Sequence, residues 1–155
     1  MKRTWTVNNE KRTVEFEPLS RLLDVLRGEL GILSPKEGCG EGECGTCSVV
    51  INNELHLACL TTAAQVEEGA EILTAEGLAS ISLGKTIKRY FDEQGAIQCG
   101  YCSPGMLLGS YALLRNNPRP SKEEIRKALS GHICRCTGYS SIVNAVDAAA
   151  KEFRK

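Results

Sequence analysis

Three cysteines lie close together in a glycine-rich segment, residues 37–47, and a fourth follows twelve residues later. They are Cys39, Cys44, Cys47 and Cys59, with the spacing C-x4-C-x2-C-x11-C. The first three follow the spacing of plant-type [2Fe–2S] sites, in which a loop wraps the cluster and turns backbone N–H groups toward its sulfurs. The interleaved glycines allow the positive φ angles and close approach that this wrapping needs. A structural zinc site usually has two C-x2-C pairs, so the pattern favours an iron–sulfur cluster over a zinc ribbon or unliganded buried thiols.

A second set of four cysteines follows in the C-terminal half. It consists of Cys99, Cys102, Cys134 and Cys136, with the spacing C-x2-C-x31-C-x-C. This spacing alone is ambiguous, because four thiolates between helix ends suit zinc and iron–sulfur chemistry equally. His132 raises the alternative of a Rieske-type centre, in which two histidines replace two cysteines on one iron. Both sets already have four cysteines and His56 falls in an expected strand, so both histidines are interpreted as non-ligands.

The charge, the apolar pattern and the cysteine count together limit the classes of protein to which the chain can belong. The 155 residues include 19 Lys plus Arg and 19 Asp plus Glu, for a formal charge of zero, so no nucleic-acid partner is expected. The N-terminus alternates apolar and polar residues without the apolar segment of a secretory signal, and no stretch suits a membrane span. We therefore expect a cytoplasmic protein, in which a disulfide framework is a poor explanation of eight cysteines. Metal binding is the default interpretation.

The N-terminal half has the period-two pattern of strands. Alternating runs predict hairpins around Asn8-Asn9 and Asn52-Asn53, and a further strand is expected within residues 70–78. Between them, residues 21–30 predict a helix with Ser20 as its cap and Gly31 as its stop. Residues 1–77 are therefore expected to form a small β-rich α+β domain.

From Ser82 onward the apolar period becomes 3.6, which predicts four helices. The second, beginning at "PGMLLGSYALLRNN", is apolar nearly all round and should be buried. The third should begin with a capping box of Ser121 and Glu124. The fourth runs from about Ser140, with Phe153 on its apolar face. A second domain is expected over residues 78–155.

Three motifs in register, "GCGEGECGTCSV", "QCGYCSPGM" and "CRCTGY", carry a resemblance that covers essentially the whole chain. The sequence closely resembles the iron–sulfur subunit of the molybdenum hydroxylase family, which includes xanthine dehydrogenase, aldehyde oxidoreductase and carbon monoxide dehydrogenase. The resemblance implies an α+β fold: a plant-type ferredoxin-like β-grasp domain with one [2Fe–2S] cluster, then an all-α four-helix domain with a second cluster. It thereby favours iron and sulfur at the second cysteine set.

The resemblance also implies roles for individual residues. The first cysteine set matches the ligands of the outer cluster, and the second matches those of the cluster beside the molybdenum cofactor. Gln98 matches a glutamine that hydrogen-bonds the pterin, and Cys136 matches the ligand lying against the pterin amine. His132 stands where the family most often has asparagine, a departure that affects local hydrogen bonding and not the ligands.

The implied function is electron transfer from a molybdenum–pterin centre through two [2Fe–2S] clusters to a flavin, in an oxidoreductase of the xanthine dehydrogenase type and thus of purine metabolism. A large subunit would hold the molybdopterin (dinucleotide) cofactor and a medium subunit FAD, in a heterotrimer able to dimerise. The chain itself is not expected to act on substrate, since it is too short for molybdenum-binding domains and lacks a Gly-rich dinucleotide fingerprint. The alternatives are a freestanding ferredoxin-like carrier and a zinc-stabilised interaction module.

Overall fold

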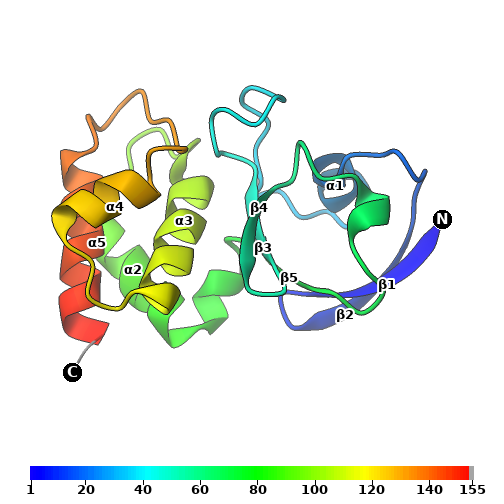
Figure 1. Ribbon diagram of the computed structural model, residues 1–155, viewed down its shortest axis with the longest axis horizontal. Coiled ribbons are helices and arrows are strands. Elements are labelled where there is room, and N and C mark those ends of the chain that lie inside the picture. The colour runs from blue at the N-terminus through cyan, green and yellow to red at the C-terminus, as the bar shows by residue number, and fades with distance from the viewer. Residues whose placement is uncertain (154–155) are drawn as a thin grey trace.

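The computed structural model describes residues 1–153 and contains one mixed β-sheet and a group of helices. Figure 1 shows the sheet with the N-terminus on the right and the helices α2 to α5 gathered on the left. A ferredoxin-like sheet domain followed by a helical part is therefore confirmed in outline. None of the helices described in residues 1–153 is long and apolar enough to cross a membrane.

The sheet has five strands in the order β2-β1-β5-β3-β4. The strands are β1 (Lys2–Val7), β2 (Glu10–Glu15), β3 (Ser48–Ile51), β4 (Glu54–Leu57) and β5 (Glu71–Leu73). Strand β1 pairs in parallel with β5, and the other pairings are antiparallel. Both expected hairpins are confirmed: Asn8 and Asn9 have φ of 51° and 70°, and Asn52 and Asn53 have 47° and 75°. Two positive φ angles are what a two-residue type I′ turn requires.

The segment after β2 differs from its prediction. The helix α1 spans only Leu22–Asp24 and continues as a π-helix, η1, over Val25–Glu29. Its N-cap is Arg21, with no side-chain cap, so Ser20 as the cap is wrong. The reason is a long-range contact: Ser20 O accepts from Ala63 N at 2.8 Å and Leu22 N donates to Thr61 O at 2.8 Å, which holds the chain extended at this point.

The remaining α-helices follow residue 81. They are α2 (Ser82–Glu93), α3 (Ser103–Asn116), α4 (Lys122–Ala128) and α5 (Ser140–Phe153), with short 3₁₀ helices η2 (Ala63–Gln65) and η3 (Gly77–Ser80) earlier in the chain. With α1, residues 1–153 contain five α-helices. Helix α3 is buried as expected, and α4 begins with the expected capping box of Ser121 and Glu124. Phe153 is 47% exposed, contrary to its placement on the apolar face.

Two hydrophobic cores support the two halves. One is built around Trp5, Leu22 and Ile72 under the sheet, and the other around Phe91 and Met106 among the helices. Val50 of β3 belongs to the helical core, and α3 packs directly against β3. The packing of α3 on the sheet brings the N-terminal end of this helix to the segment that precedes β3, and both cysteine sets lie at this junction.

Candidate metal centres

The first cysteine loop runs from residue 37 to the start of β3, and its backbone turns inward as expected. Gly40, Gly42 and Gly45 have φ of 72°, 86° and 70°, in the left-handed region that favours glycine. Gly38 instead allows the backbone to approach the Cys44 side chain closely, because a Cβ there would lie 2.7 Å from Cys44 Sγ. The N–H groups of Glu41 and Glu43 donate to Cys39 Sγ at 3.4 and 3.2 Å. The loop therefore already directs backbone donors onto a sulfur.

The thiols of this set have different electrostatic environments. The N–H of Glu41 lowers the pKa of Cys39 to about 7, because a hydrogen bond to sulfur favours the thiolate. Burial raises the pKa of Cys47 to about 12, beside the equally buried Cys59. A bound metal would favour the thiolate form at each position, since metal ligation displaces the proton.

The second set comes from two loops that face each other. Cys99 and Cys102 precede α3, and Cys134 and Cys136 lie between α4 and α5. The Cys136 thiol lies 3.6 Å from Cys99 Sγ, and both residues are exposed. Cys134 is buried and accepts from the hydroxyl of Thr137 at 3.1 Å.

The thiols of the second set also differ in pKa, because their surroundings differ. Burial, with the neighbouring Cys134 thiol, raises the pKa of Cys102 to about 12. Burial also acts to raise the pKa of Cys134, but the hydrogen bonds from Thr137 outweigh it and lower that pKa. The neighbouring thiols of Cys102 and Cys134 thus differ in how readily they lose a proton.

The eight thiols are arranged in pairs. All are free, and the neighbouring thiols are Cys39 with Cys44, Cys47 with Cys59, Cys99 with Cys136, and Cys102 with Cys134. Within residues 1–153, no group of three or more His, Cys, Asp or Glu side chains is arranged to hold a single metal ion. A [2Fe–2S] cluster takes four cysteines, two on each iron, so two pairs in each set fit that group.

The two cysteine loops are in direct contact. The N–H of Ile133 donates to Cys44 O at 2.9 Å, and the hydroxyl of Tyr101 donates to Glu37 O at 2.6 Å. Both loops lie along the upper edge of the molecule in Figure 1, where the cyan loop before β3 and the orange loop after α4 approach each other. Cysteine spacing identified neither Tyr101 nor Ile133, because their contacts cross from one half of the chain to the other.

Three candidate residues remain, namely Gln98, His56 and His132. Gln98 is exposed and immediately precedes Cys99. His56 lies in β4 with its side chain 39% exposed, 3.9 Å from Glu54. His132 is only 5% exposed and touches Ser48 Oγ with Nε2 at 3.1 Å. Sequence reasoning placed His132 beside the second set but could not detect this contact with the first loop.

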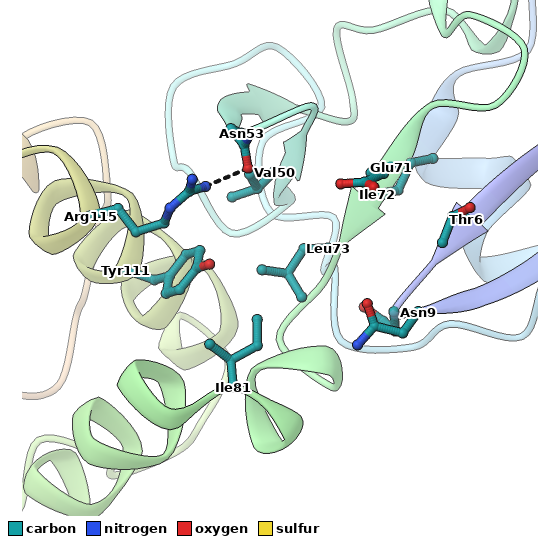
Figure 2. A pocket seen from close by; sticks show the side chains of 11 residues that line it. Thr6, Asn9, Val50, Asn53, Glu71, Ile72, Leu73, Ile81, Tyr111 and Arg115 are labelled. Atoms are coloured by element: carbon teal, nitrogen blue, oxygen red, sulfur yellow. Dashed lines mark hydrogen bonds between the residues drawn. The ribbon is translucent and has the colours of Figure 1, made fainter.

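A cavity of about 120 Å³ lies elsewhere, at the seam between the sheet and α3. Figure 2 shows Leu73, Ile81 and Tyr111 around it, with Arg115 hydrogen-bonded to Asn53 at 2.6 Å. None of the residues that line it is a cysteine, and its α3 residues come from the C-terminal half of that helix. The cavity is therefore separate from the candidate metal centres.

Comparison with known families and proteins agrees with the arrangement of the cysteines. Residues 5–74 match the model of a 2Fe-2S iron-sulfur cluster binding domain, and residues 74–147 match that of a [2Fe-2S] binding domain.

Individual relatives match over most of their length. The chain is 49% identical to the nicotinate dehydrogenase small FeS subunit of Eubacterium barkeri over 90% of its own length and 88% of that protein. It is 42% identical to a probable xanthine dehydrogenase subunit of Bacillus subtilis, over 90% and 80% respectively. Among solved structures, quinoline 2-oxidoreductase from Pseudomonas putida 86 superposes with a TM-score of 0.91 at 39% identity, over 99% of this chain and 96% of that one.

Proposed function

The chain belongs to the iron–sulfur subunits of the molybdenum hydroxylase family, and we propose that it relays electrons from a molybdenum–pterin centre to a flavin. Two [2Fe–2S] clusters, when bound, supply one-electron redox chemistry. We assign one cluster to residues 1–77 and the other to residues 78–155. The chain itself does not act on substrate.

The observation that carries this proposal is the junction of the two cysteine loops. Cys44 and Cys134 belong to different sets, yet the residue before Cys134 donates its N–H to the carbonyl of Cys44 at 2.9 Å. A short path of covalent bonds and one hydrogen bond thus joins the two sets. We therefore assign all eight cysteines as ligands, with the first set holding the outer cluster and the second the cluster nearer molybdenum.

The exposed side of the second set is proposed to meet the cofactor-bearing subunit. Cys99 and Cys136 are exposed, and so is Gln98, which immediately precedes Cys99. An amide has both donors and an acceptor for a pterin, so Gln98 is assigned to hydrogen-bond the molybdopterin (dinucleotide) cofactor and Cys136 to lie against it. A medium subunit with FAD would meet the first loop, completing a cytoplasmic heterotrimer that can dimerise.

The substrate class is proposed from the relatives, because the large subunit would hold the substrate. Their names include nicotinate and xanthine dehydrogenases, and nicotinate and xanthine are both nitrogen heterocycles. We propose an enzyme of the xanthine dehydrogenase type, with xanthine as the first substrate to assay and nicotinate as the second.

The cluster assignment is tested by iron and sulfide analysis of the purified complex with electron paramagnetic resonance. About four iron atoms and two distinct [2Fe–2S] signals are expected per small subunit, because a [2Fe–2S] cluster takes four cysteines and there are two sets. Two or fewer iron atoms after anaerobic reconstitution would contradict the proposal, and a colourless zinc-containing protein would favour the interaction module.

The direction of the relay is tested with two matched ligand variants. Cys44→Ser should stop electron delivery to flavin while a single turnover of substrate still reduces the second cluster. Cys99→Ser should prevent substrate from reducing either cluster. If Cys44→Ser instead abolished reduction of the second cluster, the order of the two centres would be reversed.

A further inference from the structure

His132 fills the space where the two cysteine loops and α3 meet. The residue is 5% exposed, and its ring lies between two glycines from different elements. A Cβ on Gly45 would lie 2.7 Å from His132 Cδ2, and a Cβ on Gly109 would lie 2.8 Å from Cε1. Contacts this short exclude a larger residue at either position. The ring is therefore held by the first cysteine loop on one side and by α3 on the other.

The hydrogen bonds at the ring define its tautomer. Ser48 Oγ donates its single proton to Gly45 O at 2.7 Å, so it has only lone pairs left for His132. The 3.1 Å contact between Ser48 Oγ and His132 Nε2 then requires a proton on Nε2. His132 Nδ1 is buried without a hydrogen-bond partner among the described residues. The imidazole is thus a hydrogen-bond donor directed at Ser48.

These bonds connect the two cysteine sets by a second route. Gly45 lies between Cys44 and Cys47, and His132 lies two residues before Cys134. The sequence of groups is Gly45 carbonyl, Ser48 hydroxyl and His132 imidazole, and both side chains are buried. It runs beside the backbone bond from Ile133 N to Cys44 O. Two adjacent connections, one of them buried, resist relative movement of the loops far better than the exposed Tyr101 contact does.

We propose that His132 and Ser48 form a positioning pair that fixes the first cysteine loop against the second, and so sets the separation and relative orientation of the two clusters. The inference rests on the proposed function, because it concerns two metal centres in one chain. Neither residue is a ligand. Their effect would be exerted through Gly45 and the loop that contains Cys134, in the way that supporting residues keep a site within a fraction of an ångström of its working geometry.

The test uses the assembled complex with both clusters reduced. At low temperature, the magnetic interaction between two reduced clusters splits their resonance signals and decreases steeply with separation. His132→Ala should retain four iron atoms per chain but lose or clearly reduce this splitting, because both the packing and the donor are removed. Ser48→Ala should reduce it too, since Nε2–H loses its acceptor. His132→Gln, whose amide nitrogen reaches about as far as Nε2, should restore most of it.

A control separates positioning from general destabilisation. Ile87→Ala removes a fully buried side chain of α2 in the helical core and should lower the melting temperature with the splitting unchanged. If His132→Ala is too unstable to isolate, Ser48→Ala and His132→Gln still decide the matter. Two intact clusters with unchanged splitting in Ser48→Ala or His132→Ala would overturn the positioning role alone, whereas absence of two clusters in the unmodified complex would overturn the proposed function.

Discussion

At the scale of single residues, identical cysteines are expected to differ in reactivity when the metal is removed. The Glu41 N–H lowers the pKa of Cys39 to about 7, and burial raises the pKa of Cys47 to about 12. Cys39 should therefore become a thiolate as the pH rises through neutrality, while Cys47 stays protonated. After chelation of the iron, alkylation by iodoacetamide should label Cys39 with a midpoint near neutral pH and leave Cys47 unlabelled, as measured by peptide mass spectrometry. Equal labelling rates at both residues would contradict this.

At Gly45 a single methyl group should be strongly destabilising, because a positive φ and a close backbone contact occur together. Its φ is 70°, and a Cβ would lie 2.5 Å from Gly131 O. Gly45→Ala should destabilise the chain by about 2 kcal/mol or more, from the left-handed backbone together with the steric conflict. Iron content and melting temperature should both fall.

The matched control for Gly45 is Gly28→Ala. Gly28 lies in η1 without a positive φ, and no atom of residues 1–153 other than its neighbours in the chain lies within 4 Å of its Cβ position. This change should be neutral or stabilising by up to about 1 kcal/mol, because alanine loses less conformational entropy on folding. Similar losses of iron in both variants would show that the position of Gly45 has no special importance.

Cysteine spacing could predict which thiols gather, because a loop of C-x4-C-x2-C can fold only a few ways around a cluster. It could not predict that Ile133 bonds to Cys44 or that His132 bonds to Ser48, since these contacts join segments more than 80 residues apart. The family resemblance drew attention to His132 only as a departure from asparagine. Its buried place between two glycines follows from tertiary packing.

At the scale of elements, prediction succeeded where the signal is local. The Asn-Asn turns have side chains that tolerate positive φ, and the capping box of α4 lies within four residues, so both were visible in the sequence. Prediction failed at α1, where an apolar pattern typical of a regular helix is overridden by pairing of residues 20–22 with residues 61–63. A pattern of apolar residues contains no information about such pairing. It also could not predict that the helix continues as a π-helix.

Glu76, in the linker between the two halves, holds several hydrogen bonds to other parts of the chain. Its carboxylate accepts from the N–H groups of Leu33 and Ser34 at 3.1 and 2.8 Å and from the Thr74 hydroxyl at 2.6 Å. Burial acts to raise the pKa of Glu76, but the hydrogen bonds from Ser34 and Thr74 hold it below its usual value, so the group is charged at neutral pH. It therefore ties the segment before the first cysteine loop to the start of the helical half.

Glu76→Gln should weaken this tie. Hydrogen bonds to a partly exposed charged group contribute about 1 kcal/mol after solvent screening. This corresponds to a melting temperature lower by about 2–4 °C in a chain of this size. The melting temperature is measured by circular dichroism of the cluster-loaded chain at neutral pH. Glu71→Gln, an exposed neighbour on β5, should change nothing, and an equal decrease in both variants would assign the effect to surface charge.

At the scale of the whole molecule, the two cysteine sets differ in what shields them. Cys47 and Cys59 are covered by the chain's own sheet domain, whereas Cys99 and Cys136 are exposed. Large side chains beside the second set are exposed too: Tyr101 is 49% exposed, Ile133 51% and Tyr139 38%. Apolar groups around an open cluster site favour a protein partner there, in agreement with the proposed docking of the large subunit on this face.

Ile133→Glu tests that docking without disturbing the fold, because the exposed side chain changes while its backbone N–H still bonds to Cys44 O. A charge placed in an apolar interface should weaken association with the large subunit about tenfold or more, equivalent to about 1.4 kcal/mol. Iron content of the isolated small subunit should stay unchanged. Leu19→Glu is the control, since Leu19 is 86% exposed but lies before α1, outside both cysteine loops, and it should leave association intact. Binding measured by co-purification or interferometry decides between them. If Ile133→Glu bound the large subunit as tightly as Leu19→Glu, the exposed apolar side chains around Cys99 and Cys136 would not be the docking surface.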